Sequence, residues 1–293
     1  MSRVAVLTVL PPQHAPPAAQ QQALATSTRP PDLVVVATQA PAVDGVPDGA
    51  PLPTQVLDAG APRPLGAARN AAVACALTEG ADLLVMLDPD CLVCPEALAR
   101  LETAAGRVPK SRPAVLVAPV HRLPPLPAGR TSYDEAELAA APPHPDLPLP
   151  PPDGQLRRES DLRMLRSTSW AIRATDWQRV GGFDEGYRGH GSEELDFAQR
   201  LAGAGGRLWW VGGATAYHRD PVPSDPPLAR LDDVLSNANR FKACWGWFPM
   251  EPWLAAFAER GLAHHDPVQD RWVAGPQPGK GKATTTTART EDG

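Results

Sequence analysis

The stretch ADLLVMLDPDCLV, residues 81–93, joins a short apolar run to two carboxylates, Asp88 and Asp90, separated only by Pro89. An apolar run of this length, followed by turn residues, predicts a buried strand. Ligands of open parallel sheets gather beyond the carboxyl ends of the strands, so the carboxylates fall where a functional site is expected. A divalent cation would relieve their repulsion and would complete its shell with phosphate and water. A plain Asp-Pro-Asp turn is the structural alternative.

Three other apolar runs resemble this strand. They are RVAVLTVL (3–10), DLVVVAT (32–38) and AVLVAPV (114–120). Helical patterns at residues 65–80 and 95–106 lie between the runs and end at Gly80 and Gly106. This alternation predicts an α/β fold, with a mostly parallel Rossmann-like sheet flanked by helices.

Proline and glycine mark the segments that interrupt this pattern. Residues 39–64 are expected to form a loop, and the Pro-rich residues 121–154 a mobile lid or an insertion. We expect one domain over 1–220, a helical appendage over 221–273 and a disordered tail over 274–293. The appendage is expected to pack on the core or to form a dimer contact, and the alternative is that its tryptophans contact a membrane surface.

The composition restricts the class of protein. The 293 residues are 43% hydrophobic, enough for a large core, and 28 Lys and Arg against 33 Asp and Glu give a net charge of −5. With no basic stripe, binding to nucleic acid is not expected. Four scattered cysteines suit a reducing cytoplasm, and no apolar run reaches the roughly 20 residues of a membrane span. Peripheral membrane contact stays open, and nothing indicates an oligomeric state.

A second acidic group follows a glycine-rich approach in VGGFDEGYRGHGSEELDFAQRLAGAGG, residues 180–206. Ser192 is the expected helix N-cap, and Glu193, Glu194 and Asp196 occupy the first turn. Acidic residues are stabilised there by the helix dipole without any catalytic role, which is the simplest explanation of the pattern. The glycines instead favour a site, because they allow close approach of the backbone.

These segments together resemble the family 2 glycosyltransferases with a galactosyltransferase-like C-terminal region. The resemblance covers most of residues 3–220 and depends on the order of its parts, which are an A-R-N helix, a strand ending in D-x-D, a G-G-F-D-E turn, a G-x-G-x-E-[DE] helix start and a later histidine. It implies a GT-A fold and inverting transfer of a hexose from a nucleotide-diphospho-sugar, with uridine as the usual base, to an acceptor hydroxyl.

The resemblance also implies a role for several residues on the donor side. Asp88 is expected near the donor ribose or sugar, and Asp90 on a cation that His218 helps to hold. A carboxylate and an imidazole suit Mn²⁺ better than Mg²⁺. Arg69 is expected to contact the diphosphate, with a solvated helix-surface cation as the alternative. Thr38 stands where relatives carry an acidic turn that reads the base, which leaves the base uncertain.

On the acceptor side the resemblance makes Glu194 the general base and Glu193 the residue that holds acceptor hydroxyls. Trp170 and Asp196 are expected to line the same pocket. A helix N-terminus lowers the basicity of a carboxylate, so burial or neighbouring acids must raise the pKa again.

Two other functions compete with glycosyl transfer. A sugar-1-phosphate nucleotidyltransferase would carry a glycine-rich loop with a basic residue after its first strand, and LTVLPPQHAPPA has neither. A non-catalytic nucleotide-sugar-binding module would bind the donor without turnover. The acids and the histidine expected for catalysis argue mildly against it.

Overall fold

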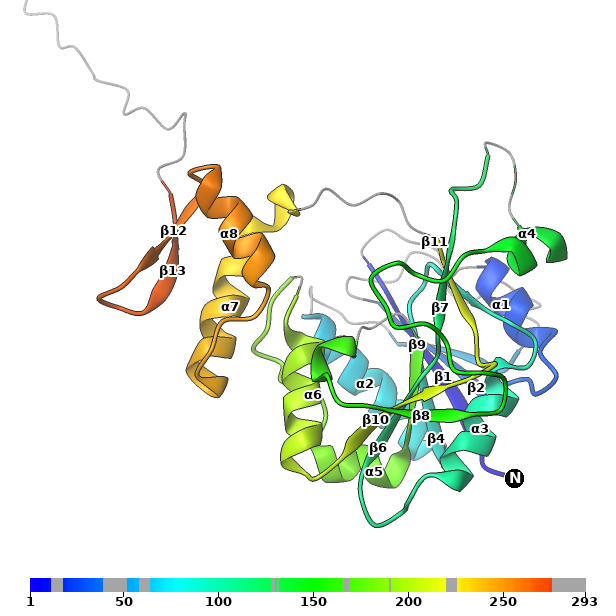
Figure 1. The fold of residues 1–293 in the computed structure, drawn as a ribbon. Coiled ribbons are helices and arrows are strands. Elements are labelled where there is room, and N and C mark those ends of the chain that lie inside the picture. Colours follow the sequence, from blue (N-terminus) through cyan, green and yellow to red (C-terminus); the bar gives the residue numbers. More distant parts are fainter. Residues whose placement is uncertain are drawn as a thin grey trace, which may run out of the picture.

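The computed structural model describes residues 1–11, 18–38, 52–57, 64–127, 130, 132–165, 169–189, 191–219 and 226–275. Its centre is an eight-stranded mixed sheet (Figure 1), which confirms the predicted α/β class. In sheet order the strands are β3 (Thr54–Leu57), β2 (Leu33–Thr38), β1 (Val4–Leu10), β4 (Leu83–Leu87), β9 (Ser169–Arg173), β6 (Ala114–Val117), β10 (Arg207–Val211) and β8 (Leu156–Glu159).

Helices cover both faces of this sheet because alternate side chains of each strand point to opposite faces. On one face Val4 and Val6 pack with α1 (Ala18–Ala25) and α3 (Ala97–Arg107). On the other face Ala5 and Leu7 join a cluster that includes α2 (Leu65–Thr78), α5 (Ala174–Val180) and α6 (Glu193–Gly203). Both faces being buried explains why the strands read as continuous apolar runs.

The fourth predicted strand, residues 114–120, is wrong in its extent. The chain leaves the large sheet after β6, and β7 (Val120–Leu123) begins a separate three-stranded sheet with β5 (Cys91–Val93) and β11 (Ala216–Arg219). Pro119 separates the two strands, and a proline has no N–H for a sheet ladder. In the large sheet β9 runs antiparallel to both β4 and β6, so the sheet is parallel only in part.

The two predicted loops contain regular structure. Residues 52–57 of the first include β3, which pairs in parallel with β2, while 39–51 and 58–63 lie outside the described residues. In the second, α4 (Glu135–Ala140) begins at a capping box in which Asp134 and Glu137 satisfy each other's backbone N–H groups. The lid expected over 121–154 is therefore partly helical. A 3₁₀ turn, η1 (Leu162–Met164), follows β8.

The C-terminal segment contains both predicted helices, α7 (Leu231–Trp245) and α8 (Glu251–Glu259), after a 3₁₀ turn, η2 (Leu228–Arg230). It also contains an unpredicted hairpin, β12 (Ala263–Asp266) and β13 (Arg271–Ala274), and these elements form their own apolar cluster next to α6 in Figure 1. The predicted tail lies outside the described residues beyond Gly275. Within the described chain no helix has the length and apolar character needed to cross a bilayer.

Several aromatic rings of this segment pack against the protein, as the packing alternative expects. Trp245 donates its Nε1–H to Asp196, and Phe248 contacts Trp272 edge to face. Trp247 keeps 37% exposure. Most of these rings are thus occupied inside the protein rather than arranged for a membrane surface.

Candidate active site

The turn after β4 carries the first predicted acids, and side chains of β1 and α1 donate hydrogen bonds to its backbone. The Thr8 hydroxyl donates to the Leu87 carbonyl oxygen at 3.0 Å. The Gln20 amide donates to the carbonyl oxygens of Asp88 at 2.7 Å and Cys91 at 2.9 Å. Three buried carbonyls are thereby satisfied, and Asp88 and Asp90 are presented at the carboxyl end of β4, as expected.

His218 reaches this turn through the small sheet. In the antiparallel pairing of β5 with β11, His218 lies opposite Cys91. This register brings His218 Nε2 to 3.1 Å from Asp90 Oδ2, although the residues are 128 positions apart in the sequence. The Cys91 Sγ lies within 4.8 Å of both ligand atoms. The two predicted metal ligands are therefore adjacent.

Arg69 joins the two predicted acidic groups. Its Nη1 lies 2.6 Å from Glu194 Oε1 and 3.7 Å from Glu193 Oε1, and its Nη2 lies 3.5 Å from Asp88 Oδ1. The guanidinium also lies over the Phe183 ring, 5.2 Å from its centroid. With 5% exposure, Arg69 is not the solvated surface cation of the alternative interpretation. We call Arg69, Asp88, Glu193 and Glu194 the acidic cluster.

Burial and neighbouring charges raise the pKa of two carboxyl groups of the acidic cluster, Asp88 and Glu193. Burial, with the charge of Asp90 adding to it, raises the pKa of Asp88 to about 7 against the opposing effect of Arg69. Burial and the charge of Glu194 raise the pKa of Glu193 to about 8. Glu193 is only 3% exposed, and among the described residues its Oε2 has no hydrogen-bond partner. Near neutral pH Glu193 is therefore mostly protonated, with an oxygen available to a bound hydroxyl.

The raised pKa of Glu193 predicts that the free energy of unfolding depends on pH. A carboxyl group with a raised pKa in the folded state favours folding at low pH, and this contribution is lost as the pH rises from about 4.5 through about 8. We expect Glu193→Gln to match the wild type at pH 5 and to exceed it at pH 9 by on the order of 2–4 kcal/mol. Urea unfolding in a chelating buffer measures this difference. Glu185→Gln, at an exposed carboxylate, should show no such pH dependence, and parallel curves for Glu193→Gln and wild type would contradict the prediction.

Two of the predicted acceptor residues lie in the protein interior. Trp170 is 1% exposed and packs against Phe197, with 5.4 Å between the ring centroids. Asp196 is 0% exposed, and its carboxylate accepts from Trp245 Nε1 at 2.8 Å and Arg200 Nε at 2.6 Å. Position 196 faces inward because it lies on the apolar side of α6, where α7 supplies polar partners. These contacts give Trp170 and Asp196 structural roles.

Thr38 lies at the carboxyl end of β2, and its hydroxyl donates to the Leu57 carbonyl oxygen at 3.3 Å. In the sheet order β1 lies between β2 and β4. Thr38 and Asp88 therefore lie at the same edge of the sheet, with one strand between theirs. Its contact with a donor stays a prediction.

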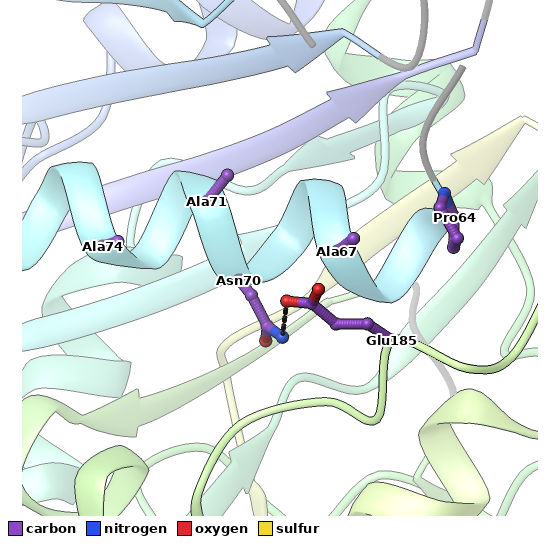
Figure 2. Close-up of a pocket in the computed structure, with 6 residues that line it drawn as sticks. All are labelled: Pro64, Ala67, Asn70, Ala71, Ala74 and Glu185. Atoms are coloured by element: carbon purple, nitrogen blue, oxygen red, sulfur yellow. Dashed lines mark hydrogen bonds between the residues drawn. The ribbon is translucent and has the colours of Figure 1, made fainter. Parts of the chain in front are cut away.

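A hollow of about 500 Å³ lies beside α2 (Figure 2). It is lined by Pro64, Ala67, Asn70, Ala71, Ala74 and Glu185. Figure 2 shows the small side chains along the helix and the Asn70 amide donating to Glu185. Arg69 is among the buried residues of the same helix and none of the acidic cluster lines this hollow, so the hollow is separate from the candidate site.

Comparison with known proteins agrees with this arrangement. Residues 155–219 match the model of a family described as the N-terminal domain of galactosyltransferase. The chain resembles a crystal structure of GalNAc-T7 with UDP, GalNAc and Mn²⁺ at a TM-score of 0.54 and 16% identity, over 88% of this chain and 55% of that one. This chain has a GT-A glycosyltransferase fold.

Two further solved structures share the GT-A fold. The mannosyltransferase PcManGT from Pyrobaculum calidifontis, in complex with GDP-Man and Mn²⁺, has a TM-score of 0.53 and 16% identity over 89% of this chain and 76% of its own. TarS 1–349 from S. aureus has a TM-score of 0.50 and 15% identity over 88% and 79%. No curated protein matches the chain in sequence. The predicted GT-A fold is confirmed, whereas membership of family 2 has no separate support.

The candidate site contains one residue, Asn70, that sequence reasoning did not assign. Asn70, next to Arg69 in the A-R-N segment, donates to the Phe183 carbonyl oxygen and accepts from the Phe183 N–H, both at 3.0 Å. Asn70 thereby fixes the loop that carries Phe183 under the Arg69 guanidinium. The A-R-N match was the available signal, because it marks both positions on one helix turn.

Proposed function

We propose that this protein is a metal-dependent glycosyltransferase that moves a hexose from a nucleotide-diphospho-sugar to an acceptor hydroxyl with inversion. The observation that carries the proposal is the Arg69 guanidinium, which contacts Asp88 on the predicted donor side and Glu194 on the predicted acceptor side. A transfer reaction needs both substrates at one place, and this single cation links the two groups of acids.

Asp90 and His218 are the proposed metal ligands. Their facing atoms, a carboxylate oxygen and an imidazole nitrogen, form a donor set that suits Mn²⁺. Cys91 is not included in this set because a thiolate is a soft ligand, whereas Mn²⁺ prefers oxygen and imidazole donors. A cation held by Asp90 and His218 would stabilise the negative charge of the departing diphosphate. Structures of GalNAc-T7 and PcManGT that contain Mn²⁺ support this choice.

Glu194 is the proposed general base. A carboxylate oxygen of Glu194 takes the proton of the acceptor hydroxyl while the hydroxyl oxygen attacks the anomeric carbon. The bond from that carbon to the diphosphate oxygen breaks, and the electron pair leaves with the diphosphate. Attack on the face opposite the leaving group inverts the configuration.

Glu193 and Glu194 are proposed to act in different protonation states. With a pKa raised to about 8, Glu193 near neutral pH can donate one hydrogen bond and accept others, which suits it to hold an acceptor hydroxyl. Glu194 instead contacts the Arg69 cation at 2.6 Å. Two carboxyl groups with distinct surroundings can thus divide binding and proton transfer.

The base of the donor is proposed to be uridine. The support is the resemblance alone, since the two Mn²⁺-containing neighbours carry different nucleotides, UDP and GDP-Man. A screen of nucleotide-sugars that follows release of nucleotide diphosphate, with Mn²⁺ and with a chelator, identifies the donor. If none of the nucleotide-sugars gave release of nucleotide diphosphate in the presence of Mn²⁺, the proposed function would be refuted.

Asp90→Ala tests the proposed metal site. We expect this variant to lose Mn²⁺-dependent binding of the nucleotide diphosphate by at least about 100-fold, because one of two protein ligands is removed. Isothermal titration of the nucleotide with and without Mn²⁺ measures the loss. Asp82→Ala is a control at a residue before β4, far along the strand from the site, and it should bind as wild type. Equal Mn²⁺ dependence in Asp90→Ala and wild type would remove Asp90 from the metal site.

The same assay separates the competing functions. A sugar-1-phosphate nucleotidyltransferase would release pyrophosphate from a nucleoside triphosphate, not nucleotide diphosphate from a sugar donor. A binding module would give Mn²⁺-dependent donor binding with no release.

A further inference from the structure

We infer that Asn237 of α7 is a positioning residue for the catalytic turn of α6. The inference rests on the proposed function, since it concerns how Glu193 and Glu194 are held for transfer. It assigns a role in the active site to the C-terminal segment, residues 226–275. None of the contacts described above joins this segment directly to the acidic cluster.

The Asn237 side chain binds the backbone just before α6. Its Oδ1 accepts from the Arg188 N–H at 3.0 Å, and its Nδ2 donates to the carbonyl oxygens of Arg188 at 2.7 Å and Gly191 at 2.9 Å. Asn237 is 1% exposed, so its own amide has no access to water as a substitute for these backbone partners. One side chain thus replaces the partners that a helix or strand would give to this segment.

The backbone that Asn237 holds has an unfavourable conformation. Gly191 has a φ of 99°, and Ser192, the residue before Glu193, has a φ of 78°. A left-handed conformation is unfavourable for a non-glycine residue, so it persists only where surrounding contacts enforce it. Such contacts are needed here because Ser192 directly sets the direction in which α6 begins.

A second contact from the same segment reaches this turn. The Ser192 hydroxyl lies 3.7 Å from the Met250 sulfur, and a Cβ on Gly191 would come within 2.8 Å of that sulfur. Met250 itself has a φ of 55°. Two non-glycine residues with positive φ therefore meet across the interface of the C-terminal segment with the turn before Glu193.

These contacts give the C-terminal segment a specific task. Without Asn237, the carbonyl oxygens of Arg188 and Gly191 lose their partner, and the turn is expected to relax toward ordinary backbone angles. Because Glu193 and Glu194 are the first residues of α6, their carboxylates would move relative to Arg69. Asp88 and Asp90, in the turn after β4, have no contact with Asn237 and should stay in place, so donor binding and transfer should respond differently.

Asn239 of the same helix offers a matched control. It makes the same kind of paired backbone contact, donating to the Trp272 carbonyl oxygen and accepting from the Trp272 N–H, both at 2.8 Å. These bonds tie α7 to the hairpin instead of to α6. Asn239→Ala therefore removes comparable hydrogen bonds from the same segment without touching the turn before Glu193.

The test compares Asn237→Ala with Asn239→Ala in the full chain. For Asn237→Ala we expect kcat to fall about 100-fold, with Mn²⁺-dependent binding of the nucleotide diphosphate within about threefold of wild type. Hydrogen exchange in peptides covering 186–198 should be at least about tenfold faster in Asn237→Ala than in Asn239→Ala. Asn237→Asp, which has the same shape but lacks the two donated N–H groups, should give the same pattern if the alanine variant folds poorly.

Two outcomes would overturn the inference. One is an equal loss of transfer in the two alanine variants, and the other is an equal loss of donor binding and transfer in Asn237→Ala. The exchange comparison needs no turnover, so it still decides whether Asn237 orders the turn if the wild type transfers no sugar. In that case the proposed function fails separately from this inference.

Discussion

Glu194→Gln is expected to lower kcat for transfer by about 10³-fold while leaving Mn²⁺-dependent donor binding unchanged. Glutamine keeps the length of the side chain, and its amide oxygen can still accept from Arg69 Nη1, which lies 2.6 Å from Glu194 Oε1. The amide cannot take the proton of the acceptor hydroxyl. The substitution therefore removes basicity and retains the contact that organises the acidic cluster.

Steady-state transfer and calorimetric donor binding together measure this effect. Glu185→Gln is the matched control, because Glu185 is exposed and accepts from Asn70 Nδ2 at 2.9 Å, a bond that a glutamine oxygen can also make. That control should transfer sugar as the wild type does. Normal turnover by Glu194→Gln would show that another group takes the proton.

Local sequence patterns predicted where the candidate catalytic residues lie, but they rarely predicted which residues these side chains contact. Asp88 and Asp90 were predictable because an apolar run ends directly before them and β4 is buried on both faces. Glu193 and Glu194 were predictable because glycines precede an amphipathic helix. Each of these inferences needs only neighbours in the sequence.

Contacts between distant segments were accessible only in part. The resemblance indicated His218 as a ligand, but its approach to Asp90 depends on the pairing of β5 with β11, which no property of either short segment determines. Likewise the A-R-N match indicated a donor contact for Arg69, while its bond to Glu194 depends on how α2 and α6 pack on one face of the sheet.

The interior positions of Trp170 and Asp196 have a different cause. A tryptophan next to a predicted site can line a pocket or fill a core, and composition does not distinguish the two. An acid in a first helical turn usually faces solvent, yet Asp196 is buried because Trp245 and Arg200 supply hydrogen bonds to it. Those partners come from the C-terminal segment and from the next helical turn, and only the three-dimensional packing combines them.

Arg69→Met is expected to have the largest effect on the protein as a whole. Methionine preserves much of the buried volume over Phe183 but removes the cation that contacts Asp88, Glu193 and Glu194. Removing one partner of a buried ion pair costs about 3–5 kcal/mol of folding stability. Transfer should fall by at least about 10²-fold, because the predicted diphosphate contact is lost as well.

The loss of stability in Arg69→Met should grow with pH. Arg69 lowers the pKa of Glu193, which burial and Glu194 raise to about 8, so removing the cation raises that pKa further. When a carboxyl pKa is raised in the folded state, the free energy of unfolding decreases as the pH rises toward that pKa. At pH 5 the Glu193 carboxyl group is protonated with or without Arg69. Urea unfolding in a chelating buffer should therefore show a deficit at pH 5 that becomes larger near pH 9.

Two variants distinguish charge from shape at this position. Arg69→Lys restores a cation but not the planar fork that reaches separate carboxylates, so we expect it to recover stability at pH 9 without recovering transfer. Arg29→Met is the matched control, since Arg29 also contacts two carboxylates, Asp32 at 2.7 Å and Glu102 at 3.1 Å, at another place in the fold. It should cost stability while sparing donor binding. A pH-independent deficit in Arg69→Met, or full transfer by Arg69→Lys, would mean that the guanidinium does not organise the acidic cluster.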